Sequence, residues 1–522
     1  MKKIKLFILI MTLCSFGMYG QKIRYINQVF DSFNVTHTFY GTNITVLASP
    51  TLIKVPLPVS IFTPKGDTVK NRPLVIYAHT GNFLPYPTNG GTNGRTSIFG
   101  NPAWASLAQL GMGFPVDSAL IEICTRLTKM GYVVAAMDYR SGWNPIATTQ
   151  GERVNTLINA AYRGVQDFRT LIRYFKLTAK LQGNPYGVDT SKIVGWGQGT
   201  GGYITLAASV LDRYSDIVNA SEGKFIGGTA AMPVPYVIES IHGDIYGTAF
   251  GKHPVTGDTL SLPNHVGYGS DFQLCVNMGG ALADSAWLDA TDLPLIAYHE
   301  PRDPFAPYKE GIVLVPVVNL PVIKVQGSYV ATKKADLLGL QKKMRDLKLN
   351  DIYTQNANKK NDGIEGLYPV TGDNPFDSDP WNWWDTTVIV AANSRNGLLT
   401  NPNMSAAKAR RYIDTLIGYF APRAFAVLNL GTFVNTPDLL KDYEVGFKMM
   451  PNPMINQTLL QTNLRYPMKS VTIYDLNGKV LRSMPKINTN NLTIYRNELP
   501  QGAYFLQVGF EKGVIAKTIL IQ

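Results

Sequence analysis

Short apolar runs and longer segments of helical spacing take turns along most of the chain. The runs 72–79 and 131–138 are almost continuously apolar, which is typical of strands covered on both faces. Segments 118–130 and 153–177 repeat apolar residues every three or four positions, as helices with one buried face do. This alternation predicts an α/β fold with a doubly wound, mostly parallel sheet.

The remaining elements are expected from the same two periods. Antiparallel strands are expected between 22 and 70, and later strands at 225–231, 274–278, 293–298 and 322–325. A Lys-rich surface helix is expected at 331–348 and a last amphipathic helix at 406–420. Segments 84–116 and 232–270 are rich in Gly and Pro, and we expect them to be a lid loop and an insertion on the side where sites are built.

The stretch 192–212 carries the most specific local pattern. It predicts a strand end, a tight Gly-rich turn at 197–202 and a helix from Tyr203. Strand, turn and helix in this order form a nucleophile elbow, G-x-S-x-G. Gly197 and Gly201 match its glycines, whereas Gly199 stands where the serine belongs.

The pattern changes from 447 onward. Short strands of alternating polarity follow one another, and Asn477-Gly478 between two of them is a strong hairpin signal. We therefore expect a larger domain at 21–430, a linker at 431–446 and a small all-β sandwich at 447–522.

Composition narrows the class of protein. The chain has 522 residues, of which 45% are hydrophobic, and a formal net charge of +12. This composition favours a large folded core over disorder. Its Lys and Arg are scattered, so we expect a solvated basic surface and no nucleic-acid partner.

The first 20 residues have the form of a secretory signal. Lys2, Lys3 and Lys5 precede a short apolar run, and cleavage is expected before Gln21. We expect no later transmembrane segment, so the protein should be exported. Cys124 and Cys275 would remain; they could pair in an exported protein, but both lie in apolar runs typical of buried free thiols.

The tail resembles the C-terminal sorting domain of type IX secretion cargo. The resemblance rests on Pro451-Asn-Pro453, Tyr474-Asp-Leu-Asn-Gly-Lys479 and Leu499-Pro-Gln-Gly-Ala-Tyr504, in that order before a Lys-bearing last strand. It implies the type IX machinery as a partner, and release outside the cell or attachment to the outer surface. A small carbohydrate-binding sandwich is the alternative.

Residues 30–430 resemble α/β-hydrolase-fold carboxylesterases. His79-Thr-Gly-Asn-Phe83 corresponds to their His-Gly-Gly-Gly-Phe oxyanion motif, and Asp138-Tyr-Arg140 to the Asp-Tyr-Arg after the next strand. The resemblance places Asp303 at the position of the triad acid. It implies a backbone oxyanion hole at Thr80, Gly81 and Thr200.

A serine esterase needs a nucleophile, a histidine base and an acid to orient it, in the chain order Ser, Asp, His. All six histidines of this chain precede Asp303. We expect 326–330 to follow the last sheet strand, which puts Ser328 or Tyr329 where the base should be. With Gly199 at the apex, two of the three triad positions are degenerate.

The sequence thus leads to a secreted pseudo-hydrolase that binds an unidentified small-molecule, ester or glycan ligand, with His79, Gln198 and Tyr329 as candidate lining residues. The alternative is an active ester hydrolase that uses Thr200 or a water activated near Asp303; a structural or adhesive surface protein is a third reading.

We expect no cofactor. The cluster Asp373, Asp377 and Asp379 is too weak to assign a metal, and we expect the tryptophans at 381, 383 and 384 to be core or lid groups more than a sugar site.

Overall fold

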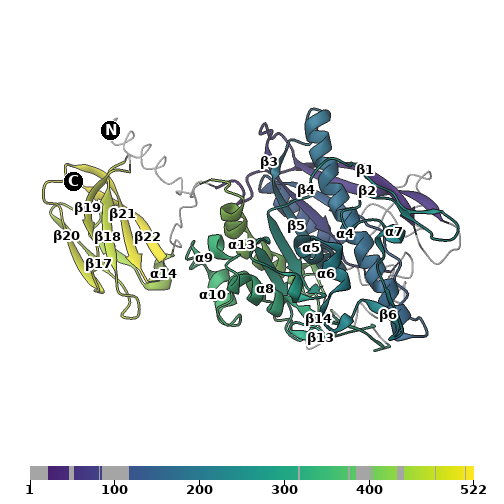
Figure 1. The fold of residues 1–522 in the computed structure, drawn as a ribbon. Coiled ribbons are helices and arrows are strands. Elements are labelled where there is room, and N and C mark those ends of the chain that lie inside the picture. Colours follow the sequence, from purple (N-terminus) through teal and green to yellow (C-terminus); the bar gives the residue numbers. More distant parts are fainter. Residues whose placement is uncertain are drawn as a thin grey trace. The chain divides into compact units, whose positions relative to one another are not determined.

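The chain forms two compact units, 1–433 and 434–522 (Figure 1). The computed structural model describes residues 22–45, 52–81, 83–84, 117–315, 318–373, 377–383, 401, 404–431, 440–476, 478–511 and 513–522. The predicted signal segment 1–20, most of the lid loop and Trp384 lie outside the described residues.

A single large sheet forms the centre of the first unit. Its eight strands run in the order β1-β2-β4-β3-β5-β10-β12-β15. The pairs β1–β2 and β2–β4 are antiparallel, and the others are parallel. The strands are Phe33–Thr45, Ile53–Pro64, Val133–Met137, Arg72–Ala78, Val188–Gln198, Leu274–Met278, Leu295–His299 and Leu367–Pro369 in that spatial order.

Helices cover both faces of this sheet, which confirms the predicted doubly wound α/β class. Alternate residues of β3 point into two cores: Leu74 and Ile76 pack with α4 (Gln150–Leu181) and α5 (Thr200–Val210). Val75 and Tyr77 pack with α3 (Ser118–Lys129) and α13 (Ala406–Val427). The continuous apolar run of this strand follows from these two cores.

The long helices begin where the sequence offers a cap. The side chains of Asp117, Thr149 and Ser405 accept hydrogen bonds from backbone N–H groups in the first turns of α3, α4 and α13. The predicted surface helix 331–348 is instead two helices, α8 (Ser328–Leu337) and α9 (Lys342–Arg345). Between them Gly339 adopts a φ of 81° that ends a helix.

Two expected strands are not in the large sheet. The run 322–325 lies in β14 (Pro321–Gly327), which pairs with β13 (Glu310–Leu314) and β11 (Ala281–Leu282) in a separate three-stranded sheet. The run 225–231 becomes a hairpin of β6 (Ile226–Thr229) and β7 (Met232–Pro235). The expectation that 326–330 follows the last strand of the large sheet is therefore wrong, because that strand is β15.

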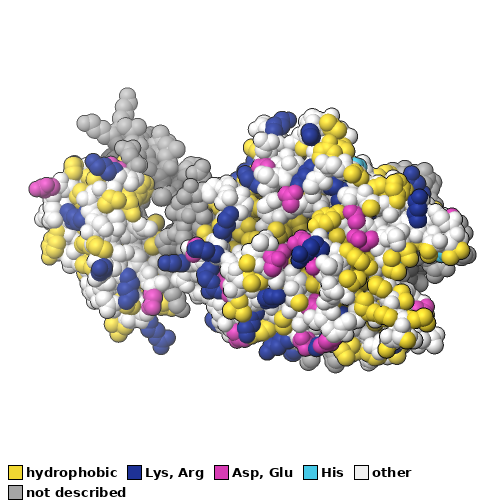
Figure 2. All heavy atoms as spheres, viewed as in Figure 1, with side chains coloured by type: hydrophobic (Ala, Val, Ile, Leu, Met, Phe, Trp, Pro, Cys, Tyr) yellow, Lys and Arg dark blue, Asp and Glu magenta, His cyan; other side chains and the backbone are white. Residues whose placement is uncertain are grey.

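Smaller elements complete the first unit. The insertion 232–270 holds one short helix and one short hairpin, and further short helices flank α5 and α9. They are α6 Tyr214–Val218, α7 Glu239–His242, α10 Ile352–Asn358, β8 Gly251–Lys252 and β9 Thr259–Ser261. On the face shown in Figure 2, the described Lys and Arg side chains are interspersed with Asp and Glu, as a solvated surface would be.

The second unit is an all-β sandwich with its own core, as predicted. One sheet has the order β16-β17-β20 and the other β19-β18-β21-β22, and both are antiparallel. The expected linker 431–446 is described only in part, and its end forms the short helix α14 (Asp442–Val445). The strands are Lys448–Met450, Gln457–Gln461, Ser470–Tyr474, Val480–Met484, Asn491–Tyr495, Gly502–Phe510 and Gly513–Ile521 for β16 to β22.

Candidate functional site

The junction of β5 and α5 has the geometry of a nucleophile elbow. Gln198 ends the strand, Thr200 begins the helix, and Gly199 between them has φ 55° and ψ −117°. The turn is tight: a Cβ on Gly201 would lie 2.8 Å from the carbonyl oxygen of His79. The predicted order of strand, turn and helix is thus confirmed, but the strand runs to Gln198 and the helix begins at Thr200 instead of Tyr203.

Thr80 occupies the space in front of the elbow apex. A Cβ built on Gly199 would lie 2.8 Å from Thr80 Cβ and closer still to Thr80 Oγ1. Real Cβ atoms do not make such contacts, so a side chain at 199 would require Thr80 to move. The hydroxyl of Thr80 therefore stands beside the place where this fold normally carries its nucleophile.

The other residues of the expected oxyanion loop form a connected layer around the apex. The imidazole of His79 stacks on Tyr139 with ring centroids 4.7 Å apart, and its Nε2 lies 3.0 Å from Asp138 Oδ1. Tyr139 Oη donates to the His79 carbonyl and lies 3.0 Å from Thr200 Oγ1. This layer fixes the Thr200 hydroxyl at the start of α5.

Gly81 and His79 are both buried next to Thr80. The Gly81 carbonyl accepts the Leu84 N–H at 3.1 Å, which closes the loop after β3. The His79 Nδ1 donates to the Thr80 carbonyl at 2.7 Å. The His79 ring is thus held by its own loop and by Asp138.

Asp303 lies in the turn that follows β12. Its Oδ1 accepts the N–H groups of Phe305 and Ala306 at 2.8 and 3.1 Å. Burial raises the pKa of Asp303 to about 8; these two N–H groups oppose the rise, whereas Asp379 and Glu300 add to it. The side chain is therefore mostly protonated at neutral pH.

The nearest imidazole to Asp303 is that of His299, and the two do not form an ion pair. His299 Nε2 lies 3.7 Å from Asp303 Oδ2, but it donates to the Ala306 carbonyl at 2.9 Å. Burial lowers the pKa of His299 to about 4. Since the histidine is neutral and the aspartic acid protonated at pH 7, the contact carries no net charge.

Sequence reasoning missed the partner on the other side of His299. Ser328 Oγ lies 2.7 Å from His299 Nδ1 and accepts a hydrogen bond from Asn277 Nδ2 at 2.8 Å. All three side chains are fully buried. No local pattern could have found this group, because its members lie on three different elements, β10, β12 and α8.

The polar atoms of the Gln198 and Tyr329 side chains are hydrogen-bonded to other protein groups. Gln198 is 1% exposed; its Oε1 accepts from Tyr77 and its Nε2 donates to Asn382 at 3.0 Å. Through these two bonds the Gln198 amide ties the end of β5 to Tyr77 and Asn382. Tyr329 lies on α8, and its hydroxyl donates to Asp362 at 3.0 Å.

The acidic cluster after β15 is tied to protein groups. Asp377 pairs with the buried Lys408 at 3.1 Å, and Asn382 donates to Asp379. Burial raises the pKa of Asp379 to about 7. Within the described residues, no three His, Cys, Asp or Glu side chains converge as metal ligands would.

Of the two tryptophans that the structure describes here, Trp381 is 1% exposed and packs in the core beside α13. Trp383 lies partly buried against the same core.

Comparisons with known proteins bear on both units. Residues 448–522 match the family described as "Secretion system C-terminal sorting domain". No curated protein is significantly similar to the chain. None of the described helices is long and apolar enough to cross a bilayer.

Solved structures similar to the chain include esterase 2 of Thermogutta terrifontis. The native form is 14% identical, with a TM-score of 0.29, and the match covers 74% of this chain and 94% of that one. The propionate-bound form is 14% identical, with a TM-score of 0.28 and coverage of 69% and 90%. The form phosphorylated by paraoxon is 16% identical, with a TM-score of 0.25 and coverage of 52% and 73%.

The strand order and helix layers described above give the first unit an α/β-hydrolase fold. The tail carries the sorting sequence of exported cargo and indicates export to the cell surface or the extracellular space. The chain therefore joins a hydrolase-like unit to a C-terminal domain of the type IX sorting family.

Proposed function

We propose that the first unit is an extracellular ligand-binding protein that has the scaffold of an esterase but no serine-hydrolase turnover. The observation that carries the proposal is the apex of the elbow. Gly199 offers no nucleophile there, and Thr80 fills the space that a nucleophilic side chain would need. Loss of a triad serine costs about 10⁶-fold in turnover.

The groups around Asp303 support the same proposal. A triad acid must be ionised to stabilise the imidazolium that forms during the reaction. Asp303 has a pKa of about 8, and His299 uses both ring nitrogens in buried hydrogen bonds. Neither residue is poised for acid–base work at neutral pH.

The ligand would meet polar groups at the start of α5. The first N–H groups of a helix have no partner within the helix and favour a carbonyl or carboxylate oxygen. The hydroxyls of Thr80 and Thr200 flank this helix start. A ligand with an ester, carbonyl or carboxylate group fits such donors.

A second candidate function is ester hydrolysis with a threonine nucleophile. The position of Thr80 Oγ1 beside the apex favours it over the use of Thr200, whose hydroxyl is held by Tyr139. This candidate needs a base, and the acid with a pKa near 8, Asp303, would fill that role only in alkaline solution.

The test is to produce residues 21–522, called the mature chain below, and to treat the purified protein with a fluorophosphonate probe and with p-nitrophenyl acetate. We expect no labelling and no hydrolysis above that of the heat-unfolded protein. Turnover that Thr80→Val abolishes and Thr80→Ser preserves would overturn the proposal and establish the second candidate. Thr200→Val is the matched control, since it removes a neighbouring hydroxyl of the same kind.

A further inference from the structure

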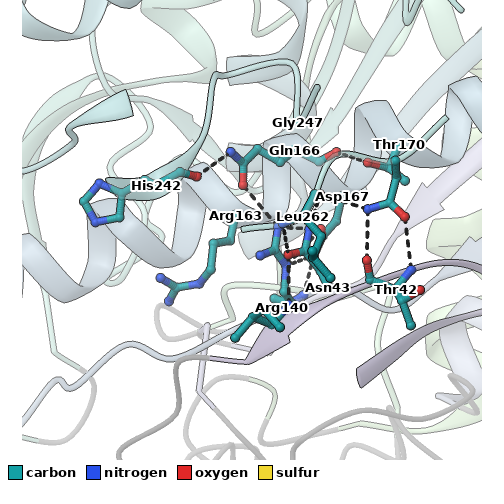
Figure 3. Close-up of polar contacts among 12 residues, drawn as sticks. Thr42, Asn43, Arg140, Arg163, Gln166, Asp167, Thr170, His242, Gly247 and Leu262 are labelled. Carbon is teal, nitrogen blue, oxygen red and sulfur yellow. Dashed lines mark hydrogen bonds and ion pairs between the residues drawn. The ribbon is translucent and has the colours of Figure 1, made fainter. Parts of the chain in front are cut away.

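A cavity of about 210 Å³ lies against α4, on the side of the short helix α7. Its lining includes Arg140, Asn159, Arg163 and His242. None of these residues takes part in the elbow or in the function proposed above. In Figure 3 the side chains of Arg163 and His242 extend to the same side, while Arg140 is bound by Asp167 and Gln166 of α4.

Each of the two arginines has a hydrogen-bond donor without a partner among the described residues. Arg140 uses Nε and Nη2 on Asp167 and Gln166 at 2.8 to 3.1 Å, and its Nη1 has no partner among the described residues. Arg163 donates from Nη2 to the Ser141 carbonyl at 2.9 Å, and within the same described part its Nε is unpaired. Arg140 is 2% exposed and Arg163 8%. A buried donor without an acceptor is costly, so these atoms point to a missing ligand.

The residues that line the cavity also carry an excess of positive charge. Asp167 forms an ion pair with Arg140 at 2.8 Å and offsets that charge. Arg163 forms no ion pair among the described residues. Burial and, to a smaller extent, nearby Arg140 lower its pKa to about 9, although Asp167 opposes both. The side chain is still charged at pH 7, and an anion beside it would relieve its burial.

Two neutral groups at the cavity add one hydrogen-bond donor and one acceptor. His242 Nδ1 accepts the Ile238 N–H at 2.9 Å, and burial lowers the pKa of this histidine to about 4. The neutral ring therefore carries its proton on Nε2, which makes it a third donor. Asn159 uses its Nδ2 on backbone and side-chain oxygens, and its Oδ1 has no donor within the described part of the chain.

We propose that this cavity binds a small oxyanion that carries a hydroxyl group, as hydrogen phosphate and α-hydroxy-carboxylates do. The unpaired atoms of Arg140, Arg163 and Asn159 have almost no accessible surface, so binding requires these side chains to turn toward the cavity. The oxyanion oxygens then take the N–H groups of Arg140, Arg163 and His242, and the hydroxyl donates to Asn159 Oδ1. The volume suits a ligand of few heavy atoms, since a water molecule takes about 30 Å³ and drug-sized ligands need about 300 Å³ or more.

The test is calorimetric titration of the mature chain with inorganic phosphate, glycolate, sulfate and chloride. We expect saturable binding of phosphate and glycolate, and weaker binding of sulfate, which has no hydroxyl for Asn159. Arg163→Gln should weaken phosphate binding by about 10-fold to 100-fold, because a charged hydrogen-bond donor is lost. Arg411→Gln changes an exposed arginine on α13 and should leave binding unchanged.

Circular dichroism would show whether each variant is folded. His242→Phe is the second variant; it removes the neutral Nε2 donor and also the acceptor of the Ile238 N–H. A parent protein that binds neither phosphate nor glycolate would overturn the proposal. Equal phosphate affinity in the parent, Arg163→Gln and His242→Phe would also overturn it.

Discussion

The side chain of Thr80 and the bare Cα of Gly199 face each other across the elbow, with Thr80 Cβ only 2.8 Å from where a Cβ on residue 199 would stand. The two residues come from different segments, the loop after β3 and the turn after β5. Packing against Thr80 therefore requires glycine at 199, and glycine there also means that the apex carries no nucleophile. The fit also makes the pair open to direct measurement.

Gly199→Ala should lower the free energy of unfolding by about 2–5 kcal/mol, from backbone strain at φ 55° and from the clash with Thr80. Urea denaturation measures the loss. Adding Thr80→Ala should recover part of it, so the double variant should lose less than the two single variants together. Gly66→Ala is the control, since Gly66 has φ 78° and open space around it. Strictly additive losses would mean that Thr80 and residue 199 do not interact.

The stability of the first unit should fall as the pH rises from 6.5 to 8. The folded pKa of Asp303, about 8, lies above its unfolded value of about 4, so the stabilisation is complete below about pH 4 and is lost progressively as the pH rises to 8. Over this window the slope from Asp303 is about 1 kcal/mol per pH unit. Asp303→Asn keeps the acceptor oxygen for Phe305 and Ala306 and should make the profile less steep, while Asp379, with a pKa raised to about 7, keeps its own contribution. The profile is obtained from urea midpoints at each pH, and an unchanged slope in Asp303→Asn would contradict the assignment.

Removing one partner of the buried pair Arg140–Asp167 should be strongly destabilising. Asp167→Ala leaves the Arg140 charge unpaired and should cost about 3–5 kcal/mol of unfolding free energy. Asp346→Ala breaks the exposed pair with Lys342 and should cost about 1 kcal/mol or less. Thermal and urea unfolding of the two variants provide the comparison. Similar losses in both would show that burial of the Arg140 pair does not set its contribution.

Cys124 and Cys275 should stay unreactive in the folded protein. Both are buried free thiols, as the sequence indicated, and burial raises the pKa of Cys275 to about 12. The mature chain should show no reaction with a thiol-specific dye until it is unfolded, when both thiols should react. Rapid labelling of the folded chain would place a thiol at the surface.

Deletion of 448–522 should stop the chain from reaching the cell surface or the medium. The match of this segment to the sorting-domain family is the reason, since sorting is the role of that domain. The assay is detection of the parent and the truncated chain in fractionated cells of the producing bacterium. A control chain that lacks only the exposed residues 252–258 is not expected to change location. Normal export of the truncated chain would contradict the role of the tail.

Local patterns were enough for most strands of the large sheet and for the elbow, although the short edge strand β15 was not expected. The run 274–278 became β10 with the same bounds, because an apolar run buried on both faces has few other solutions. The run 322–325 was misplaced, since four apolar residues look the same in a central strand and in the outer hairpin with β13.

The polar groups of the interior could not be read from the sequence. Ser328 and His299 are 29 positions apart and meet only through the fold. Arg163 lies on α4, and its surroundings come from distant segments, the loop after β4 with Ser141 and α7 with His242. Such groups become visible only when distant segments are brought together.

The Thr80–Gly199 fit also limits how this site can change. A variant with serine at position 199 would carry a steric clash until position 80 changed too. An unstrained hydroxyl at residue 199 therefore requires two linked substitutions, and a single mutation does not supply it.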